Sequence, residues 1–275
     1  MSIRIEGLSF AYGSTLVLDD VTLQNARPGE LLGIVGPNAA GKSTFLKCAA
    51  GLLRARAGRV WLGDEEVRTA DQWRRLRRHV TYLPQEYAST AAITVFEAVL
   101  VARQQTASWI VGDDDVAAVA TILDELRLEP IALRYLSELS GGQRQMVAVA
   151  QALAREPRVL LLDEPTSSLD LQRQLELLQL VQALAAERSM TVLIALHDLN
   201  LTARFVDRLV ILHQGRAYAD GAPADVLTEM MLHQVYGVEA RVERDADGLP
   251  RFTPLRSVRD RAALAGEPAL ASSTT

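Results

Sequence analysis

Hydrophobic residues recur with two different periods along this chain. Apolar and polar residues alternate, as is typical of half-buried strands, at residues 3–10 and 16–23. Shorter apolar-rich runs, which are typical of strands buried in a parallel sheet, are present at residues 31–35, 79–83, 159–162 and 191–196. A hairpin is predicted at residues 208–219, where a turn containing Gly215 separates two such stretches.

Helical spacing replaces the strand pattern between about residues 94 and 156. Apolar residues recur at helical spacing over residues 95–104, 116–128 and 144–155. This block predicts a helical insertion into an α/β domain. Other helices are predicted at residues 43–50, 175–186, 198–204 and 222–236. The tail from about residue 260 is rich in Ala, Ser and Thr, and is predicted to be flexible.

Composition narrows the class of protein. A chain of 275 residues with 49% hydrophobic residues can bury a sizeable core. The net charge of -5 gives no electrostatic reason to expect nucleic acid as a partner. The single cysteine, Cys48, excludes an internal disulfide and favours a reducing compartment. The N-terminus lacks a signal-peptide pattern and no apolar run approaches membrane-spanning length, so a cytosolic protein, or one held at a membrane by partners, is expected.

A glycine-rich segment after the run at 31–35 matches the pattern G-x-x-x-x-G-K-[ST]. Its residues are Gly36, Pro37, Asn38, Ala39, Ala40, Gly41, Lys42, Ser43 and Thr44. A strand before this loop and a helix after it form the context in which backbone N–H groups bind phosphate. Lys42 would then reach the outer phosphates, and the Ser43 hydroxyl would ligate Mg²⁺. A glycine-rich turn with a chance lysine is the competing interpretation, but the chain has only two lysines, Lys42 and Lys47.

Polar residues stand at the ends of three predicted strands. Asp163 and Glu164 follow one run, and Gln85 and His197 follow two others. Small-molecule sites favour this edge of an open α/β sheet. Two carboxylates there suit phosphate chemistry, in which one holds Mg²⁺ and the other polarises an attacking water. An acidic strand-to-loop turn without that role is the alternative.

Two further segments carry candidate binding residues. Ser140 is a natural N-cap, and Gly141 and Gly142 leave backbone amides unshielded at the start of a helix, which predicts a second anion site. Tyr12, on a turn predicted at residues 11–14, could stack on a nucleobase, although on its own it fits an ordinary turn aromatic better.

Taken together, these motifs resemble the ATP-binding subunits of ABC transporters over about residues 1–240. The glycine-rich loop matches the family's Walker A motif, and the segment ending in Asp163 and Glu164 matches its Walker B motif. The family's signature sequence is matched by Leu139, Ser140, Gly141, Gly142 and Gln143. Its adenine-stacking aromatic, Q-loop, D-loop and switch histidine are matched by Tyr12, Gln85, Asp170 and His197.

The resemblance implies an α/β P-loop NTPase fold with a mixed sheet. An N-terminal antiparallel β subdomain, a helical subdomain inserted at about residues 88–156 and a C-terminal extension over 241–275 are expected. ATP and Mg²⁺ are the implied cofactors, and Ser43, Gln85 and Asp163 are the implied metal site.

The resemblance also implies how such a site works. Two chains pair head to tail, so that ATP lies between the Lys42 loop of one and the Ser140 helix start of the other. Glu164 acts as general base or orients the water, and His197 contacts the γ-phosphate. Gln85 links the metal site to the helical block, which contacts a membrane permease.

Residues 196–201 and 235–238 resemble, less specifically than these motifs, the ATP-binding subunits of importers of ferric siderophores, haem and cobalamin. This likeness implies separate permease subunits, a periplasmic or lipid-anchored binding protein as an indirect partner, and a peripheral position on the cytoplasmic face of the bacterial inner membrane. An importer ATPase for another solute and a soluble ATPase uncoupled from transport remain alternatives. A non-catalytic, nucleotide-gated protein is a third, suggested only by Ala39, where the family usually has glycine.

Overall fold

The computed structural model describes residues 1–85, 92–104 and 111–258. The tail that is predicted to be flexible from about residue 260 lies outside these residues. Within the described part of the chain, no helix is long and apolar enough to cross a membrane.

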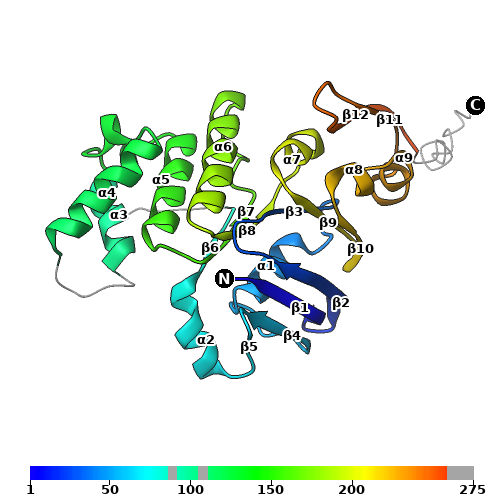
Figure 1. Ribbon diagram of the computed structural model, residues 1–275, viewed down its shortest axis with the longest axis horizontal. Helices are drawn as coiled ribbons and strands as arrows, with labels where there is room; N and C mark the ends of the chain where they lie inside the picture. The colour runs from blue at the N-terminus through cyan, green and yellow to red at the C-terminus, as the bar shows by residue number, and fades with distance from the viewer. Residues whose placement is uncertain (86–91, 105–110, 259–275) are drawn as a thin grey trace, which may run out of the picture.

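A six-stranded sheet with the order β10-β9-β3-β8-β7-β6 forms the centre of the molecule (Figure 1). Its strands are β3 (Leu31–Val35), β6 (Val80–Leu83), β7 (Val159–Asp163), β8 (Thr191–Ala195), β9 (Arg208–His213) and β10 (Arg216–Gly221). All neighbours pair in parallel except β10, which is antiparallel to β9. Every residue of β3, β7 and β8 is buried, as expected for central parallel strands. Because these strands run in parallel, their carboxyl ends lie at the same edge of the sheet.

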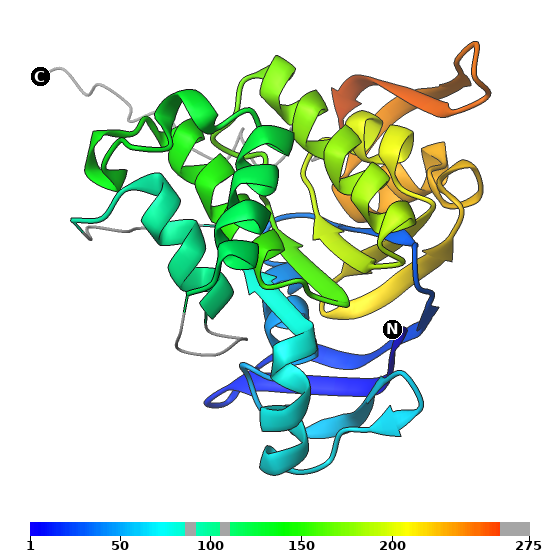
Figure 2. The ribbon, with the colours of Figure 1, turned by 60° about the vertical axis from the view of Figure 1, so that its left-hand side comes forward.

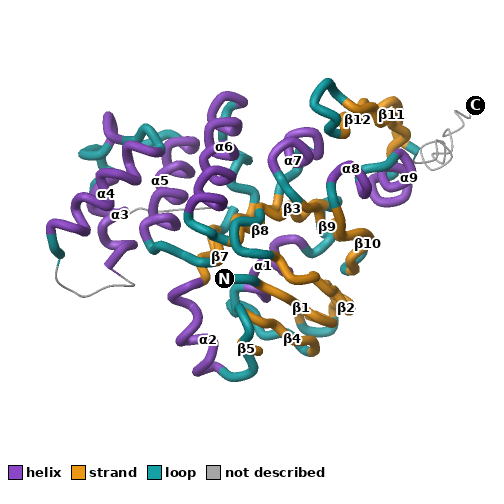
Figure 3. Tube along the Cα trace, in the orientation of Figure 1, coloured by secondary structure: helices purple, strands orange, loops and turns teal. Residues whose placement is uncertain are grey.

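A second, antiparallel sheet with the order β2-β1-β4-β5 lies beside the first (Figures 1 and 3). It consists of β1 (Ile3–Tyr12), β2 (Thr15–Ala26), β4 (Ala57–Leu62) and β5 (Glu65–Glu66). Helix α1 (Lys42–Ala49) packs between the two sheets, because Phe45 shares one hydrophobic cluster with Ile5 of β1 and Leu161 of β7. The turn expected at residues 11–14 is shorter than predicted, since Tyr12 still belongs to β1.

A group of helices covers the end of the main sheet next to β6 (Figure 2). It contains α3 (Val95–Gln104), α4 (Asp113–Glu125) and α5 (Gly141–Ala154), with short 3-10 turns η2 (Glu129–Ile131) and η3 (Leu136–Glu138) between the last two. Helix α6 (Leu171–Glu187) packs next to them. Their apolar faces share one cluster with β7 and β8. This is the helical block that the change of hydrophobic period predicts, although α4 lies three residues earlier than its predicted range.

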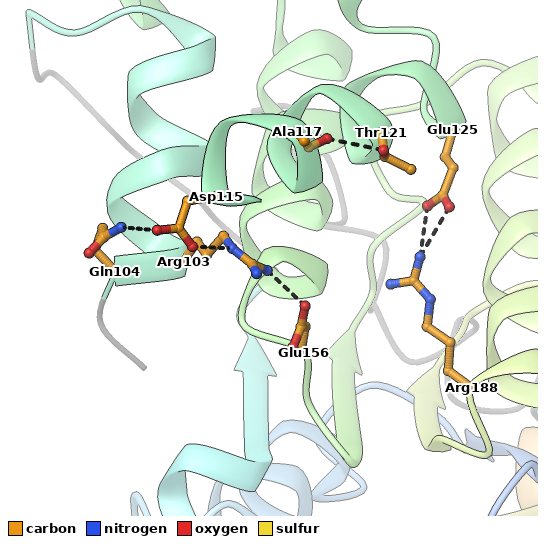
Figure 4. A network of polar contacts seen from close by, with 8 residues as sticks. All are labelled: Arg103, Gln104, Asp115, Ala117, Thr121, Glu125, Glu156 and Arg188. Atoms are coloured by element: carbon orange, nitrogen blue, oxygen red, sulfur yellow. Dashed lines mark hydrogen bonds and ion pairs between the residues drawn. The ribbon is translucent and has the colours of Figure 1, made fainter. Parts of the chain in front are cut away.

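Ion pairs join the helices of this block to one another and to the end of α6 (Figure 4). Arg103 of α3 contacts Asp115 of α4 and Glu156, which follows α5, at 2.8 Å each. Arg188, which follows α6, contacts both carboxylate oxygens of Glu125 at 3.0 and 3.1 Å. The two contacts hold opposite ends of α4, one against α3 and the other against the end of α6.

The remaining elements lie outside the two sheets and the helical block described above. They are α2 (Ala70–Leu76), η1 (Arg77–His79), α7 (Leu199–Phe205), α8 (Pro223–Val226), α9 (Glu229–Met231), the π-helical turn η4 (Leu232–Tyr236), β11 (Val238–Arg244) and β12 (Pro250–Ser257). The single helix predicted over 222–236 is wrong. Leu227 has a non-helical ψ of 84°, and the Thr228 side chain caps a new helix by accepting from the Met231 N–H.

The hairpin of β11 and β12 is not predicted by the sequence pattern. The Asn200 side chain of α7 anchors it, because its amide donates to the Phe252 carbonyl at 3.2 Å and its oxygen accepts from the Phe252 N–H at 2.9 Å. Val242 and Phe252 pack against the main core. The boundary expected at residue 240 therefore falls inside β11.

Candidate functional site

The glycine-rich loop joins β3 to α1 and lines an open pocket of about 540 Å³. The residues that line it are Val17, Asn38, Ala39, Ala40, Gly41, Lys42, Ser43, Thr44, Gln85, Glu164 and His197. The structure thus brings together residues from the ends of three parallel strands and from the loop after β3. This is the edge at which open α/β sheets bind small molecules.

The backbone of the loop leaves room for an anion at the start of α1. Gly41, the N-cap residue, has a φ of 100° and gives no side-chain cap to the helix, so the first N–H groups are not covered from that position. Gly36 has a φ of 153°, and a Cβ there would lie 2.2 Å from the Leu212 carbonyl oxygen, so only glycine fits. Ala39 has a φ of 64°, in the left-handed region where an alanine stores backbone strain.

Lys42 is buried beneath the loop. Its Nζ donates to the Gly36 carbonyl at 2.9 Å and to the Pro37 carbonyl at 3.3 Å. Burial lowers the pKa of its ammonium group, and the nearby Glu164 and Asp163 carboxylates partly oppose this effect. A buried ammonium group that is held only by loop carbonyls and two acidic neighbours can exchange these carbonyls for phosphate oxygens.

Asp163, at the end of β7, is 2% exposed and accepts two hydrogen bonds. The Ser43 hydroxyl donates to its Oδ1 at 3.0 Å, and the Tyr82 hydroxyl donates to its Oδ2 at 2.9 Å. A serine hydroxyl and a carboxylate this close are hard oxygen donors that suit Mg²⁺. Gln85 lies just beyond β6, exposed, and its side chain lines the same pocket.

Glu164 follows Asp163 and is also buried. Its φ of 51° is left-handed, a conformation that non-glycine residues adopt mainly where the structure requires it. Its Oε1 lies 2.6 Å from the Nε2 atom of His197, which follows β8. This geometry turns a buried carboxylate toward the phosphate pocket and covers it with an imidazole.

Four of the predicted residues lie at the start of α5 and do not line this pocket. Ser140 and Gln143 cap each other reciprocally: Gln143 N–H donates to the Ser140 hydroxyl at 3.2 Å, and Ser140 N–H donates to Gln143 Oε1 at 2.9 Å. A Cβ on Gly141 would meet nothing within 4 Å, so this helix start is open to an outside group, and Gly142 packs beside the Ser168 carbonyl.

Asp170 and Tyr12 are also separate from the pocket. The Asp170 side chain caps α6 by accepting from the Arg173 N–H at 2.9 Å, and it shares a different pocket, of about 470 Å³, with Gln143. Tyr12 is 51% exposed at the end of β1 and meets the Phe10 ring edge-on at 4.8 Å between centroids. One copy of the chain therefore presents the predicted residues in separate groups.

Two tyrosines near this site are not predicted by the sequence to be part of it. Tyr82 belongs to no motif, and the strand pattern shows only that it is half-buried. Burial raises the pKa of the Tyr236 hydroxyl, and the nearby Gly36 backbone N–H opposes that shift. The likeness at residues 235–238 contains Tyr236, but nothing in the sequence indicates that it reaches the glycine-rich loop.

A family model described as "ABC transporter" matches residues 18–167. Among curated proteins, an uncharacterized ABC transporter ATP-binding protein of Methanocaldococcus jannaschii is 38% identical, over 93% of this chain and 98% of that protein. The hemin import ATP-binding protein HmuV of Rhodococcus jostii is also 38% identical, over 94% and 88% of the two chains. The iron(3+)-hydroxamate import ATP-binding protein FhuC of Bacillus subtilis is 35% identical, over 89% and 91%.

Solved structures with the same fold include an inward-facing ABC transporter described as of metal-chelate type. It superimposes with a TM-score of 0.78 at 27% identity, over 93% of this chain and 98% of that one. A dimeric ATP-binding cassette in a post-hydrolysis state with ADP and Pi gives a TM-score of 0.72 at 28% identity, over 80% and 98%. These matches confirm the predicted α/β cassette fold.

Proposed function

This chain belongs to the ATP-binding subunits of ABC transporters, and from that premise we propose that it powers import of an iron-chelate (siderophore), haem or cobalamin-type solute through a separate permease. ATP hydrolysis is the activity of the family. The main support is that the buried Lys42 ammonium group lies beneath the glycine-rich loop, with the Glu164 and Asp163 carboxylates close to it. Relatives named for hemin, iron-hydroxamate and cobalamin import support the solute class.

The residues of the pocket have different roles in ATP binding and hydrolysis. The amides of residues 38–44 bind the phosphates, and Lys42 gives up its bonds to the loop carbonyls and reaches the outer ones. Glu164 orients the attacking water and takes its proton, because its buried carboxylate faces the pocket. His197 holds that carboxylate and contacts the γ-phosphate.

Mg²⁺ is the metal that the donors fit. The residues that hold it are Ser43 and Asp163, which already lie 3.0 Å apart, with Gln85 at the mouth of the pocket. The ion, when bound, neutralises charge on the phosphate oxygens. Within the chain, the Ser43 hydroxyl and the Asp163 carboxylate keep two oxygen donors turned toward each other.

The complete site requires a second copy of the chain. Ser140, Gly141, Gly142 and Gln143 do not line the pocket of their own chain, yet Gly141 leaves a helix start open. We propose that this helix start closes on ATP held by the loop of the partner, and that Asp170 lies at the same interface. Tyr12, exposed at the end of β1, stacks on the adenine. A dimeric cassette among the structural neighbours is consistent with this arrangement.

The proposed unit is an ATPase domain over residues 1–240, with the helical block at about 88–156 and an extension over 241–275. The helical block contacts the permease, and Gln85 links it to the metal site. The protein then lies peripherally on the cytoplasmic face of the inner membrane. A periplasmic or lipid-anchored substrate-binding protein acts with the permease and does not touch this chain.

A deletion and complementation experiment tests the importer proposal. Uptake of a ferric siderophore, haem and cobalamin is measured in a host strain that lacks this gene and carries either the wild-type gene or Glu164→Gln. The proposal predicts that one of the three uptakes is lost on deletion, returns with the wild-type gene and stays lost with Glu164→Gln. Unchanged uptake of all three contradicts the solute class and favours an importer for another solute or a soluble ATPase uncoupled from transport.

A further inference from the structure

The Asp163 carboxylate is held from two sides by hydroxyl groups of different elements. The Ser43 hydroxyl of α1 donates to Oδ1 at 3.0 Å, and the Tyr82 hydroxyl of β6 donates to Oδ2 at 2.9 Å. With a residue exposure of 2%, Asp163 has little access to water and depends on protein donors. The proposed role of Ser43 and Asp163 as metal ligands uses the first contact and leaves the second unexplained.

The sheet places Tyr82 at this position by pairing and by alternation. In the parallel pair of β6 and β7, Tyr82 stands opposite Leu161, two residues before Asp163. Tyr82 packs with Val80 in the hydrophobic cluster that includes Phe45 of α1. Leu83 belongs instead to the cluster under the helical block. Tyr82 therefore faces the helix that carries Ser43, and its hydroxyl reaches the acidic end of the neighbouring strand.

The Tyr82 side chain is half-buried on β6, and its hydroxyl donates to the Asp163 carboxylate at 2.9 Å. Tyr82 is not among the residues that line the phosphate pocket, so it reaches the chemistry only through Asp163.

We propose that Tyr82 is a positioning residue of the metal site, which fixes the Asp163 carboxylate so that Oδ1 stays turned toward Ser43. A ligand whose rotation is fixed by a hydrogen bond binds metal more tightly than one that must be ordered on binding. Tyr82 stands three residues before Gln85, so β6 carries the donor to Asp163 and leads directly to the residue at the mouth of the pocket. The inference rests on the proposed Mg²⁺·ATP site.

The test is Tyr82→Phe, which removes only the hydroxyl, with Tyr218→Phe as the matched control. Tyr218 also donates its hydroxyl to one side chain, Gln234, but it lies on β10. Three quantities are measured for each protein: ATP binding in EDTA, Mn²⁺ binding to the ATP-loaded protein by electron paramagnetic resonance, and the Mg²⁺ concentration that gives half-maximal ATPase rate. Thermal unfolding of the nucleotide-free protein reports on folding.

We expect Tyr82→Phe to weaken Mn²⁺ binding and to raise the half-maximal Mg²⁺ concentration by about tenfold. Metal-free ATP binding should stay within about twofold of wild type, because the loop amides and Lys42 are untouched. Tyr218→Phe should match wild type in all three. Unchanged metal dependence in Tyr82→Phe overturns the inference, as does an equal loss of metal-free ATP binding, which would indicate a structural role. If the wild-type protein itself shows no metal-dependent site, the proposed function fails and not the role of Tyr82 alone.

Discussion

The Nε2 atom of His197 lies 2.6 Å from Oε1 of Glu164, although the two residues are 33 positions apart in the sequence. They meet because β7 and β8 are neighbours in the parallel sheet. Glu164 directly follows the last residue of β7, and His197 comes two residues after the end of β8. The Glu164 side chain is 8% exposed and that of His197 is 51% exposed. The imidazole therefore lies between a buried carboxylate and the open side of the pocket.

This pair predicts the effect of Glu164→Gln. The amide keeps the shape of the side chain but cannot take a proton from water, so turnover should fall by about 100-fold or more while ATP binding persists. Dimers should accumulate with ATP. ATPase assays and light scattering check both outcomes, with Glu187→Gln on the exposed end of α6 as the control. Hydrolysis at the wild-type rate would refute the role of Glu164.

Lys42→Ala should weaken the binding of ATP strongly. The variant loses the buried ammonium group that faces the loop, and a charge-assisted contact of this kind contributes about 1.5–3 kcal/mol, or roughly 10- to 150-fold in Kd. Lys47→Ala is a natural control, because it removes the only other lysine of the chain from the same helix. Isothermal titration with ATP measures both. Equal affinities of the two variants would contradict the role of the loop.

Ala39→Gly should stabilise the protein. A left-handed backbone at alanine destabilises the folded state by about 1–2 kcal/mol. Glycine avoids this strain but lowers the free energy of unfolding by about 0.5–1 kcal/mol, because the unfolded chain has more conformational freedom. The net gain of about 0.5–1 kcal/mol corresponds to a rise in Tm of about 1–3 °C. The buried Ala40, whose φ is not positive, supplies the control, since Ala40→Gly should lower the Tm. A fall in Tm for Ala39→Gly would show that the loop stores no strain at this position.

Tyr236→Phe should loosen the glycine-rich loop from the C-terminal segment. The variant removes the hydroxyl that lies near the Gly36 N–H, and it should weaken ATP binding by about threefold to tenfold if this contact orders the loop. Titration of ATP against wild type, Tyr236→Phe and the distant Tyr218→Phe measures this effect. If Tyr236→Phe binds ATP as tightly as Tyr218→Phe does, the contact does not shape the loop.

The main elements and the phosphate loop follow from the sequence because local patterns determine them. The run at residues 31–35 and the helix at 95–104 have in the structure the ranges that their periods predict. Ser140 caps α5 as its position before two glycines indicates. These features depend on residues within a few positions of one another.

The contacts that the sequence does not reveal are those between distant elements. Tyr82 reaches Asp163 only because β6 and β7 are neighbours, and no spacing of 81 residues can indicate that pairing. The β11–β12 hairpin depends on Asn200, some fifty residues before Phe252. The break at Leu227 depends on Thr228 capping a new helix, a signal too weak to outweigh the apolar pattern around it.

The most direct test of the account is whether two chains share each ATP site. Ser140→Arg and Lys42→Ala chains are prepared with different tags, mixed, and purified through both tags. Each variant alone should be inactive, because every site of its homodimer lacks either the loop lysine or the open helix start. The mixed dimer contains one site with both parts intact, so it should recover about half the wild-type ATPase rate. A mixed dimer as inactive as its parents would contradict head-to-tail pairing.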